Sequence, residues 1–395
     1  MAKSTRLVKK PNAFLWYTLG PIAKLWYKTR VKFTSEKIKA EGKTLFLASH
    51  RNYYDIMVAF CALFPKRVHF VSTSYWYRNK TLGSLLRTLG CIKKDQYKSD
   101  IQAIKGMAEC FSNNESIILF PEAQISVDGR PQLLVPGLDK LILKYKPSVY
   151  ILHSHGAFAS KPKWAKKASR GPVDVWFTKL FSPADLDAFN PNDIMPKIEE
   201  ELSLDNDLKW LSENPDIKYI NKNKAWGLEK VLVYCPKCHS ELTLKTDHSR
   251  LYCDCGFSVN LKKENYELLP NEYGLNNLDD IFSFEYEMLK NDYENDIVLE
   301  DSCKIVAYLG EVPVEETSYN KVKMTKDSIT FISPDKEESF ELSKLISFVI
   351  TLDLSFEVPT NTYTYRVYPE NGRRSIHYWY LMRYIKEKLA RESKN

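Results

Sequence analysis

The feature that most constrains the fold of this chain is an alternation of strand-like and helix-like segments between residues 44 and 190. Short apolar runs predict buried strands. These runs are LFLA (45–48), RVHFVST (67–73), IILF (117–120), SVYILHS (148–154) and VDVWFTKLF (173–181). Helix-like runs lie between them, and they begin at Ile56 or cover residues 82–90, 101–111 and 138–145. The alternation predicts an α/β fold with a mainly parallel sheet flanked by helices.

A histidine and an aspartate follow the first of these strands. His50 stands where the apolar run ends, and Asp55 comes five residues later, just before the helix from Ile56. We expect Asp55 to cap that helix while its carboxylate reaches an imidazole nitrogen of His50. A histidine held in this way is suited to act as a general base. The alternative is a surface histidine beside a helix-capping aspartate.

A second motif follows the strand IILF and reads FPEAQIS (120–126). The pair of motifs, H-x4-D after one strand and FPE after another, resembles the glycerolipid acyltransferase family, which includes the lysophosphatidic-acid acyltransferases. The chain keeps the family's Phe, Pro, Glu and Ser as Phe120, Pro121, Glu122 and Ser126. It departs from the family's Gly, Thr and Arg with Ala123, Gln124 and Ile125.

The resemblance covers roughly residues 40–190 and implies a function. In the family, the histidine that matches His50 deprotonates an acceptor hydroxyl, which attacks an acyl thioester directly. The residue that matches Asp55 orients this histidine. Residues that match Glu122 and Ser126 bind the acceptor. The resemblance therefore implies an acyl-CoA or acyl-carrier-protein thioester as donor, and a lysophospholipid or glycerol-phosphate-type acceptor.

The family's arginine for the acceptor phosphate has candidate replacements in this chain. Between the two motifs the family has a glycine-spaced segment that ends in an arginine, and here Lys93 or Lys94 stands at that place. Arg130, shortly after the second motif, is another cation that suits a phosphate. The alternative for Lys93 and Lys94 is a solvated turn.

Two further histidines, His153 and His155, alternate on the strand SVYILHS and its extension. Alternation places their side chains on the same side of the sheet. Two histidines at this spacing can bind a metal, but no carboxylate cluster lies beside them in the sequence. We expect strand residues near the active-site cleft.

Residues 11–33 mix aromatic and aliphatic side chains with lysine and arginine. Gly20-Pro21 predicts two short helical pieces with a kink. Trp16 and Trp26 near the two ends, with basic flanks, are typical of an interfacial membrane helix, and the alternative is a helix docked on the protein's own core. The net charge of +7 suits an anionic membrane or a phosphate-bearing substrate. It is too small to indicate nucleic acid.

The chain has no apolar run near the length of a membrane span and no signal-peptide pattern. We therefore expect a peripheral protein on the cytoplasmic face of a membrane. Four scattered cysteines agree with reduced thiols in that compartment. They are Cys61, Cys91, Cys110 and Cys303.

The other four cysteines form two close pairs, Cys235 with Cys238 and Cys253 with Cys255. Strand-like residues follow each pair, namely SELTL (240–244) and FSVNL (257–261). The pattern resembles a zinc ribbon, in which four thiolates bind structural Zn²⁺. The second pair is C-x-C rather than C-x-x-C, which leaves His239 or His248 as alternative ligands.

The rest of the chain predicts short β segments between Phe282 and Phe356 and a strand beyond them, then a helix in HYWYLMRYIKEKL (377–389). This order resembles a PH/GRAM-like domain. The predicted organisation is an interfacial segment (1–35), an acyltransferase domain (36–192), a helical connector (193–228), a zinc ribbon (229–262) and a β-rich domain (263–395). The rival to an enzyme is a non-catalytic, membrane-associated lipid-binding adaptor built on a degenerate acyltransferase domain.

Overall fold

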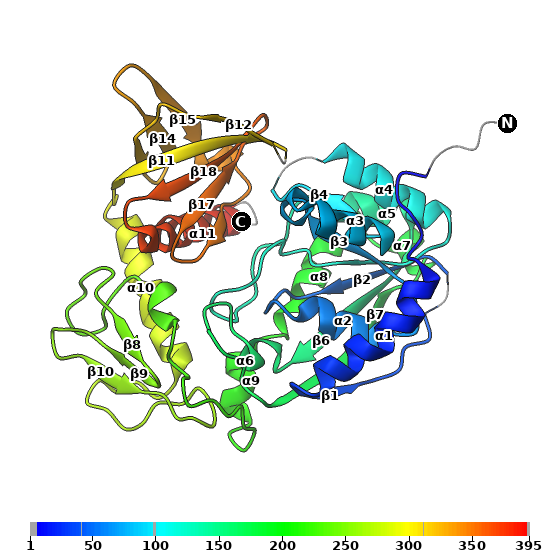
Figure 1. Ribbon diagram of the computed structural model, residues 1–395, viewed down its shortest axis with the longest axis horizontal. Helices are drawn as coiled ribbons and strands as arrows, with labels where there is room; N and C mark the ends of the chain where they lie inside the picture. Colours follow the sequence, from blue (N-terminus) through cyan, green and yellow to red (C-terminus); the bar gives the residue numbers. More distant parts are fainter. Residues whose placement is uncertain (1–5, 41, 98–99, 311, 393–395) are drawn as a thin grey trace. The chain divides into compact units, whose positions relative to one another are not determined.

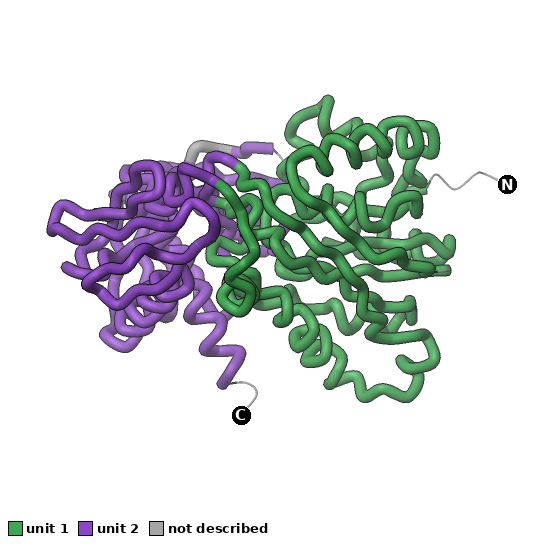
Figure 2. Tube along the Cα trace, turned by 90° about the horizontal axis from the view of Figure 1, so that it is seen from below, with its two compact units in different colours: residues 1–95, 99–163, 168–220 green, residues 96–98, 164–167, 221–395 purple. Residues whose placement is uncertain are grey.

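The computed structural model describes residues 6–40, 42–97, 100–310 and 312–392, and these form two compact units (Figure 2). Unit 1 comprises residues 1–95, 99–163 and 168–220. Unit 2 comprises residues 96–98, 164–167 and 221–395. The start of the predicted segment 1–35 and the end of the predicted domain 263–395 lie outside the described residues, and the five-segment division stays a prediction.

Unit 1 contains one mainly parallel sheet with the strand order β1-β7-β6-β2-β5-β3-β4 (Figure 1). Its strands are β1 (Lys32–Ser35), β2 (Thr44–Ala48), β3 (His69–Thr73), β4 (Ile92–Lys94), β5 (Ile117–Leu119), β6 (Ser148–His155) and β7 (Pro172–Phe181). Neighbouring strands run parallel except β6 and β7, which are antiparallel. The predicted α/β fold is therefore confirmed. The short strands β1 and β4 were not predicted.

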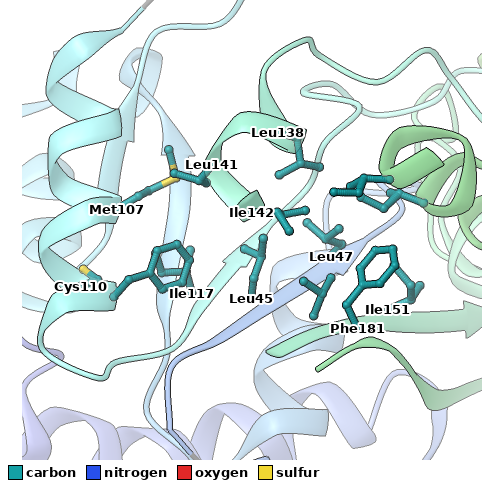
Figure 3. Close-up of a cluster of buried hydrophobic side chains, with 14 of the residues drawn as sticks. Leu45, Leu47, Met107, Cys110, Ile117, Leu138, Leu141, Ile142, Ile151 and Phe181 are labelled. Carbon is teal, nitrogen blue, oxygen red and sulfur yellow. The ribbon is translucent and has the colours of Figure 1, made fainter. Parts of the chain in front are cut away.

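Helices cover both faces of this sheet. They are α1 (Ala13–Lys28), α2 (Asp55–Leu63), α3 (Lys80–Thr88), α4 (Ile101–Ser112), α5 (Leu138–Tyr145), α6 (Ala157–Ser160), α7 (Asp185–Ala188), α8 (Ile194–Ser203) and α9 (Asp207–Glu213). Every residue of β2 is buried because alternate side chains enter two different cores. Leu45 and Leu47 pack with α4, α5 and α8 (Figure 3), and Phe46 and Ala48 pack with α1 and α2. This central position fixes the end of β2, where His50 follows.

The N-terminal helix differs from the prediction because α1 is one continuous helix that contains Pro21. Gly20 precedes the proline, so the Cβ that would clash with the proline ring is absent. Gly20 also lets the helix approach α2 closely, since a Cβ there would lie 2.9 Å from ring atoms of Phe60 and Phe64. Packing on α2 therefore favours continuation of the helix over a break.

One face of α1 docks on unit 1 and the other is exposed. Trp16 is 3% exposed and packs edge-on against Phe60. The opposite face presents Phe14, Ile22 and Leu25, which are 74%, 65% and 67% exposed. A docked face and an apolar outer face thus coexist on α1, and membrane binding by the outer face stays a prediction. Trp16 therefore belongs to the docked face of α1 and not to the exposed one.

Unit 2 begins with a small antiparallel sheet of β8 (Lys245–Asp247), β9 (Arg250–Tyr252) and β10 (Ser258–Asn260). The prediction of a strand at 240–244 is wrong, because β8 begins only at Lys245, after that segment. A helix, α10 (Leu278–Glu294), occupies the start of the region that was expected to be β-rich. A capping box between Asn277 and Asp280 starts this helix, and that pair is the sequence signal that could have predicted it.

The second sheet of unit 2 is antiparallel, with the order β15-β14-β13-β11-β18-β17-β16 and with β12 paired to β11. Its strands are β11 (Leu299–Leu309), β12 (Val312–Glu316), β13 (Lys321–Met324), β14 (Ser328–Ile332), β15 (Glu337–Glu341), β16 (Val349–Thr351), β17 (Ser355–Pro359) and β18 (Thr364–Pro369). The chain then forms α11 (Ser375–Glu392), which buries Tyr378, Met382 and Ile385. The β-rich region with a C-terminal helix is confirmed. Short 3₁₀ helices are η1 (Ser74–Arg78), η2 (Pro191–Asp193), η3 (Leu228–Lys230), η4 (Leu342–Lys344) and η5 (Gly372–Arg374).

Candidate active site and metal site

His50 and Asp55 lie side by side just beyond the carboxyl end of β2. His50 Nδ1 is 2.8 Å from Asp55 Oδ2, and the two side chains are 19% and 5% exposed. The imidazole stacks on Phe120 with ring centroids 4.7 Å apart. Because the carboxylate holds the proton on Nδ1, the other nitrogen, Nε2, is the proton acceptor. Nε2 has no hydrogen-bond partner among the residues that the structure describes.

Asp55 holds the turn before α2 rather than capping the helix. It is the first residue of α2, and Tyr54 occupies the cap position without a side-chain hydrogen bond. Asp55 Oδ2 accepts hydrogen bonds from the backbone N–H groups of Arg51 and Asn52 as well as facing His50. Three donors on one oxygen direct the carboxylate back toward β2. The predicted capping role is therefore wrong, and the predicted contact with the imidazole is present.

Behind the histidine, Arg51 and Glu122 form a buried ion pair. Arg51 Nη1 lies 3.0 Å from each carboxylate oxygen, and both side chains are 0% exposed. Glu122 Oε2 also accepts the backbone N–H of His50 at 3.2 Å. Burial raises the pKa of Glu122, and Arg51 opposes that rise. The structure thus brings the two motifs together, but the Glu122 carboxylate faces Arg51 and the His50 main chain. Its acceptor-binding role stays a prediction.

In the FPEAQIS loop, Ala123 stands where the family has glycine, and its backbone adopts a conformation that glycine favours. Ala123 has a φ of 61°, in the left-handed region that glycine adopts freely. An L-residue there costs about 1–2 kcal/mol. Ile125, at the family's arginine position, is buried at 9% exposure. The Ser126 N–H donates to the His50 carbonyl at 2.8 Å, which ties this loop to the first motif.

Two other acceptor candidates, Ser126 and Arg130, lie in the loop that follows Glu122. The Ser126 hydroxyl is buried against Asp128 Oδ1 (2.9 Å) and the Arg130 carbonyl (3.0 Å). The Arg130 carbonyl also accepts from Arg51 Nη1 at 3.3 Å. The Arg130 main chain is therefore part of the same network as the two motifs.

Lys93 and Lys94 lie on β4 rather than in a turn, where they pair with Ser72 and Thr73 of β3. Strands β2, β5, β3 and β4 are parallel, so the ends that carry His50 and Lys94 share one edge of the sheet. Three strand spacings separate them, or about 14 Å. Burial lowers the pKa of Lys94. The Lys94 ammonium donates to the Asp95 carbonyl at 3.2 Å, and the role of this lysine at an acceptor phosphate stays a prediction.

His153 and His155 face the same side of β6, as predicted, and both rings contact Trp176. His153 is fully buried, with Nδ1 3.0 Å from Asp205 Oδ1 and Nε2 3.1 Å from the Thr178 hydroxyl. Neither histidine belongs to a potential metal cluster among the described residues. They are strand residues packed beside the site.

Sequence reasoning missed Arg51 and Asp205 as members of the site, and it also missed the burial of Asp207 two residues further on. Both aspartates are 0% exposed, although they come from the segment that was predicted as a polar connector. The Asp-Asn-Asp run at 205–207 has the composition of a solvated turn. Only the tertiary fold shows that these charges are buried.

Residues 30–152 match the acyltransferase family model. This match confirms the family resemblance for the region that carries His50, Asp55 and Glu122. No curated protein matches the chain. A solved structure that does match is the 1-acyl-sn-glycerophosphate (LPA) acyltransferase PlsC from Thermotoga maritima. It is 16% identical, with a TM-score of 0.39, over 48% of this chain and 79% of that chain.

The matched region ends within β6, so β7 and the segment with Asp205 lie outside the match. Within the matched region, the carboxyl ends of β2 and β5 bring together His50 and Asp55 and the buried ion pair of Arg51 and Glu122. An acyltransferase domain with this geometry can accept a proton at His50 Nε2 while Asp55 stabilises the imidazolium.

A second site lies in unit 2, where the four paired cysteines converge. Their Sγ atoms all lie within 4.8 Å of one another. Cys235 and Cys255 are 3.6 Å apart, and Cys238 and Cys253 are 3.9 Å apart. Four sulfurs at about 2.3 Å from a tetrahedral Zn²⁺ are about 3.8 Å from one another, so the donor set fits that ion.

The alternative ligands His239 and His248 are not part of this cluster. The His239 ring packs against Phe284, and His248 Nδ1 lies 2.7 Å from the Asn223 side-chain oxygen. Among the residues that the structure describes, the four thiols therefore make up this candidate metal site.

Proposed function

We propose that the protein transfers a fatty acyl group from an acyl thioester to the hydroxyl of a lysophospholipid or glycerol-phosphate-type acceptor. The observation that carries the proposal is the His50 imidazole, which Asp55 holds through Nδ1. This histidine lies within the region that matches the acyltransferase family. An adaptor with a degenerate domain would not need this arrangement.

The chemistry requires one proton transfer at His50. Nε2 accepts the proton of the acceptor hydroxyl while the oxygen attacks the thioester carbonyl carbon. The carbon–sulfur bond of the resulting tetrahedral intermediate then breaks, and the leaving thiolate receives the proton from the imidazolium. Asp55 stabilises the imidazolium between these steps. No covalent acyl-enzyme is needed, because a general base and the positioning of the two substrates supply the rate.

The test is acyl transfer by the purified protein with a panel of lysolipids and of CoA or carrier-protein thioesters. Formation of a diacyl product identifies the acceptor headgroup and the donor. If the protein binds lysolipid but transfers no acyl group from any thioester, the adaptor interpretation replaces this proposal.

Arg130 is the acceptor-phosphate cation that we favour, because its main chain already belongs to the network around Arg51. Arg130→Gln should raise the acceptor KM more than it lowers kcat, since a phosphate contact binds ground state and transition state alike. Lys93→Gln and Lys94→Gln are the matched comparisons at the distant strand β4. Unchanged acceptor kinetics in all three variants would show that no phosphate binds at these cations.

We also propose that the exposed face of α1 binds the cytoplasmic surface of a membrane. Among the described residues, no helix has both the length and the apolar character needed for a membrane span. The outer face of α1 is apolar, and Arg30 lies over the Trp26 ring at 3.8 Å. Lys28 is exposed beside it. Lys24 differs from the expected lipid-facing cation because its ammonium donates to the Cys61 carbonyl at 3.0 Å.

Ile22→Glu and Leu25→Glu should each weaken binding to anionic vesicles by about ten- to hundredfold, because burying such a side chain contributes about 1.5–3 kcal/mol. Their melting temperatures should change little. Trp16→Glu is the matched comparison and should lower the melting temperature, since Trp16 is buried against Phe60. Vesicle sedimentation and thermal melting distinguish these effects. Normal sedimentation of both outer-face variants would exclude this face as the membrane contact.

The four-cysteine cluster should hold one structural zinc ion per chain, which elemental analysis can count. When bound, the ion supplies a cross-link that stabilises a small sheet with little core of its own. Cys238→Ser should lose the zinc and destabilise the ribbon, whereas Cys303→Ser, outside the cluster, should retain it. A metal-free preparation with a folded ribbon would contradict this, and so would acyl transfer that requires zinc as a Lewis acid.

A further inference from the structure

Asp205 lies in the turn between α8 and α9 and contacts the residues on both sides of His50. Its Oδ2 accepts from the Ser49 hydroxyl at 2.9 Å, and its backbone carbonyl accepts from Arg51 Nε at 3.0 Å. The other carboxylate oxygen, Oδ1, is 3.0 Å from His153 Nδ1. The Asp205 side chain is 0% exposed, so these contacts are made away from water.

The histidine itself is held by two further groups. Asp55 faces its Nδ1, and the Glu122 carboxylate accepts its backbone N–H. Glu122 is bound in turn to Arg51. The side chain of His50 and both of its chain neighbours are therefore fixed by buried carboxylates. Of these three carboxylates, Asp205 alone comes from outside residues 30–152.

We propose that Asp205 is a positioning residue for His50, and that the catalytic unit extends through the α8–α9 turn. The proposal rests on the proposed acyl transfer and adds a residue that does not touch substrate. Asp205 holds Ser49 and thereby the end of β2, which places His50 Nε2 at the reacting distance from the acceptor hydroxyl. Misplacing a catalytic group by about 1 Å can lower a rate by about a hundredfold.

The contacts of Asp205 determine which substitution tests its side chain. In Asp205→Asn the backbone carbonyl still accepts from Arg51. The amide has one acceptor oxygen instead of two, so it cannot accept from Ser49 and from His153 together. Ser49→Ala removes the hydrogen bond from Ser49 to Asp205, together with the longer one to the Leu202 carbonyl at 3.5 Å, and leaves the Asp205 carboxylate beside His153. It therefore remains informative if Asp205→Asn fails to fold.

Asp207 provides a matched control two residues away. It is equally buried, and it accepts from the backbone N–H groups of Gly156 and Ala159 instead of from the neighbours of His50. Burial raises its pKa to about 6. Asp207→Asn thus perturbs the same turn and also replaces a buried carboxyl group. General loosening of the turn would affect both variants alike.

The experiment measures kcat and KM in the full-length enzyme for each variant. Asp205→Asn and Ser49→Ala should lower kcat by about 10- to 100-fold with little change in acceptor KM. Their combination should be no worse than Asp205→Asn alone. Asp207→Asn should have a much smaller effect on kcat. In a His50→Ala background, Asp205→Asn should leave the residual rate unchanged, because it acts through the histidine.

Three outcomes would overturn the proposal. They are a parental kcat in folded Asp205→Asn and Ser49→Ala, an equal loss of kcat in Asp207→Asn, or a further loss in the His50→Ala background. Failure of the proposed function itself looks different, because the parental enzyme would then transfer no acyl group at all.

Discussion

His50→Ala lowers the rate of acyl transfer by about 10²–10⁴-fold in our account, because it removes the general base. The protein should still fold, since the imidazole is 19% exposed and its substitution leaves the backbone N–H that binds Glu122 in place. Asp55→Asn should cause a smaller loss, because the imidazole remains while its orientation and the charge that stabilises the imidazolium are lost. Initial rates, with thermal melting as the check on folding, measure both effects.

His155→Ala is the matched control for this prediction. His155 lies on β6 at the same carboxyl edge of the sheet, but its ring packs against Trp176 and Trp210 rather than a carboxylate of the site. It should retain most of the activity. Equal losses of activity in the His50 and His155 variants would mean that either substitution only disturbs the carboxyl edge of the sheet. A parental rate in folded His50→Ala would refute the general-base mechanism.

Arg51→Met should destabilise the protein by about 3–5 kcal/mol, which is the usual cost of leaving a buried charge without its partner. The unpaired group would be Glu122, whose side chain is 0% exposed. The loss should be visible in chemical denaturation as a lower midpoint. Adding Glu122→Gln should recover part of the stability, because the neutral amide no longer requires a counter-charge.

The matched surface pair is Lys197 with Glu200, whose charged atoms are 2.7 Å apart and whose side chains are 41% and 68% exposed. Lys197→Met should cost less than about 1 kcal/mol, since water screens exposed pairs. If Arg51→Met is as mild as Lys197→Met, the buried pair does not stabilise the loops around His50. If Glu122→Gln adds its full cost to Arg51→Met, the two charges are not coupled.

The sequence predicts the α/β sheet of unit 1 well, because its strands and helices depend on short-range patterns of apolar residues. Apolar runs such as LFLA become buried strands, and H-x4-D places His50 just after one of them. FPE follows a parallel neighbour, so the two motifs meet at one edge of the sheet. The contact between His50 and Asp55 was predictable for the same reason, since the five-residue spacing closes within one turn.

What the sequence did not predict depends on long-range packing. Nothing local distinguishes Asp205 from a solvated turn residue, and its burial follows only from the docking of α8 on the sheet. In the sequence, Arg51 resembles a surface cation. Its burial depends on Glu122, which comes from the second motif. Likewise, Pro21 predicts a kink, but packing of Gly20 against α2 keeps the helix continuous.

The most direct test of the central claim follows both products of one reaction. The purified protein is incubated with a radiolabelled acyl thioester and an excess of lysophospholipid, and the free thiol and the labelled diacyl lipid are measured together. The account predicts that the two appear in equal amounts and that omission of the acceptor nearly abolishes thiol release. Thiol release at the same rate without acceptor, or no diacyl lipid with any lysophospholipid or glycerol-phosphate acceptor, would contradict it.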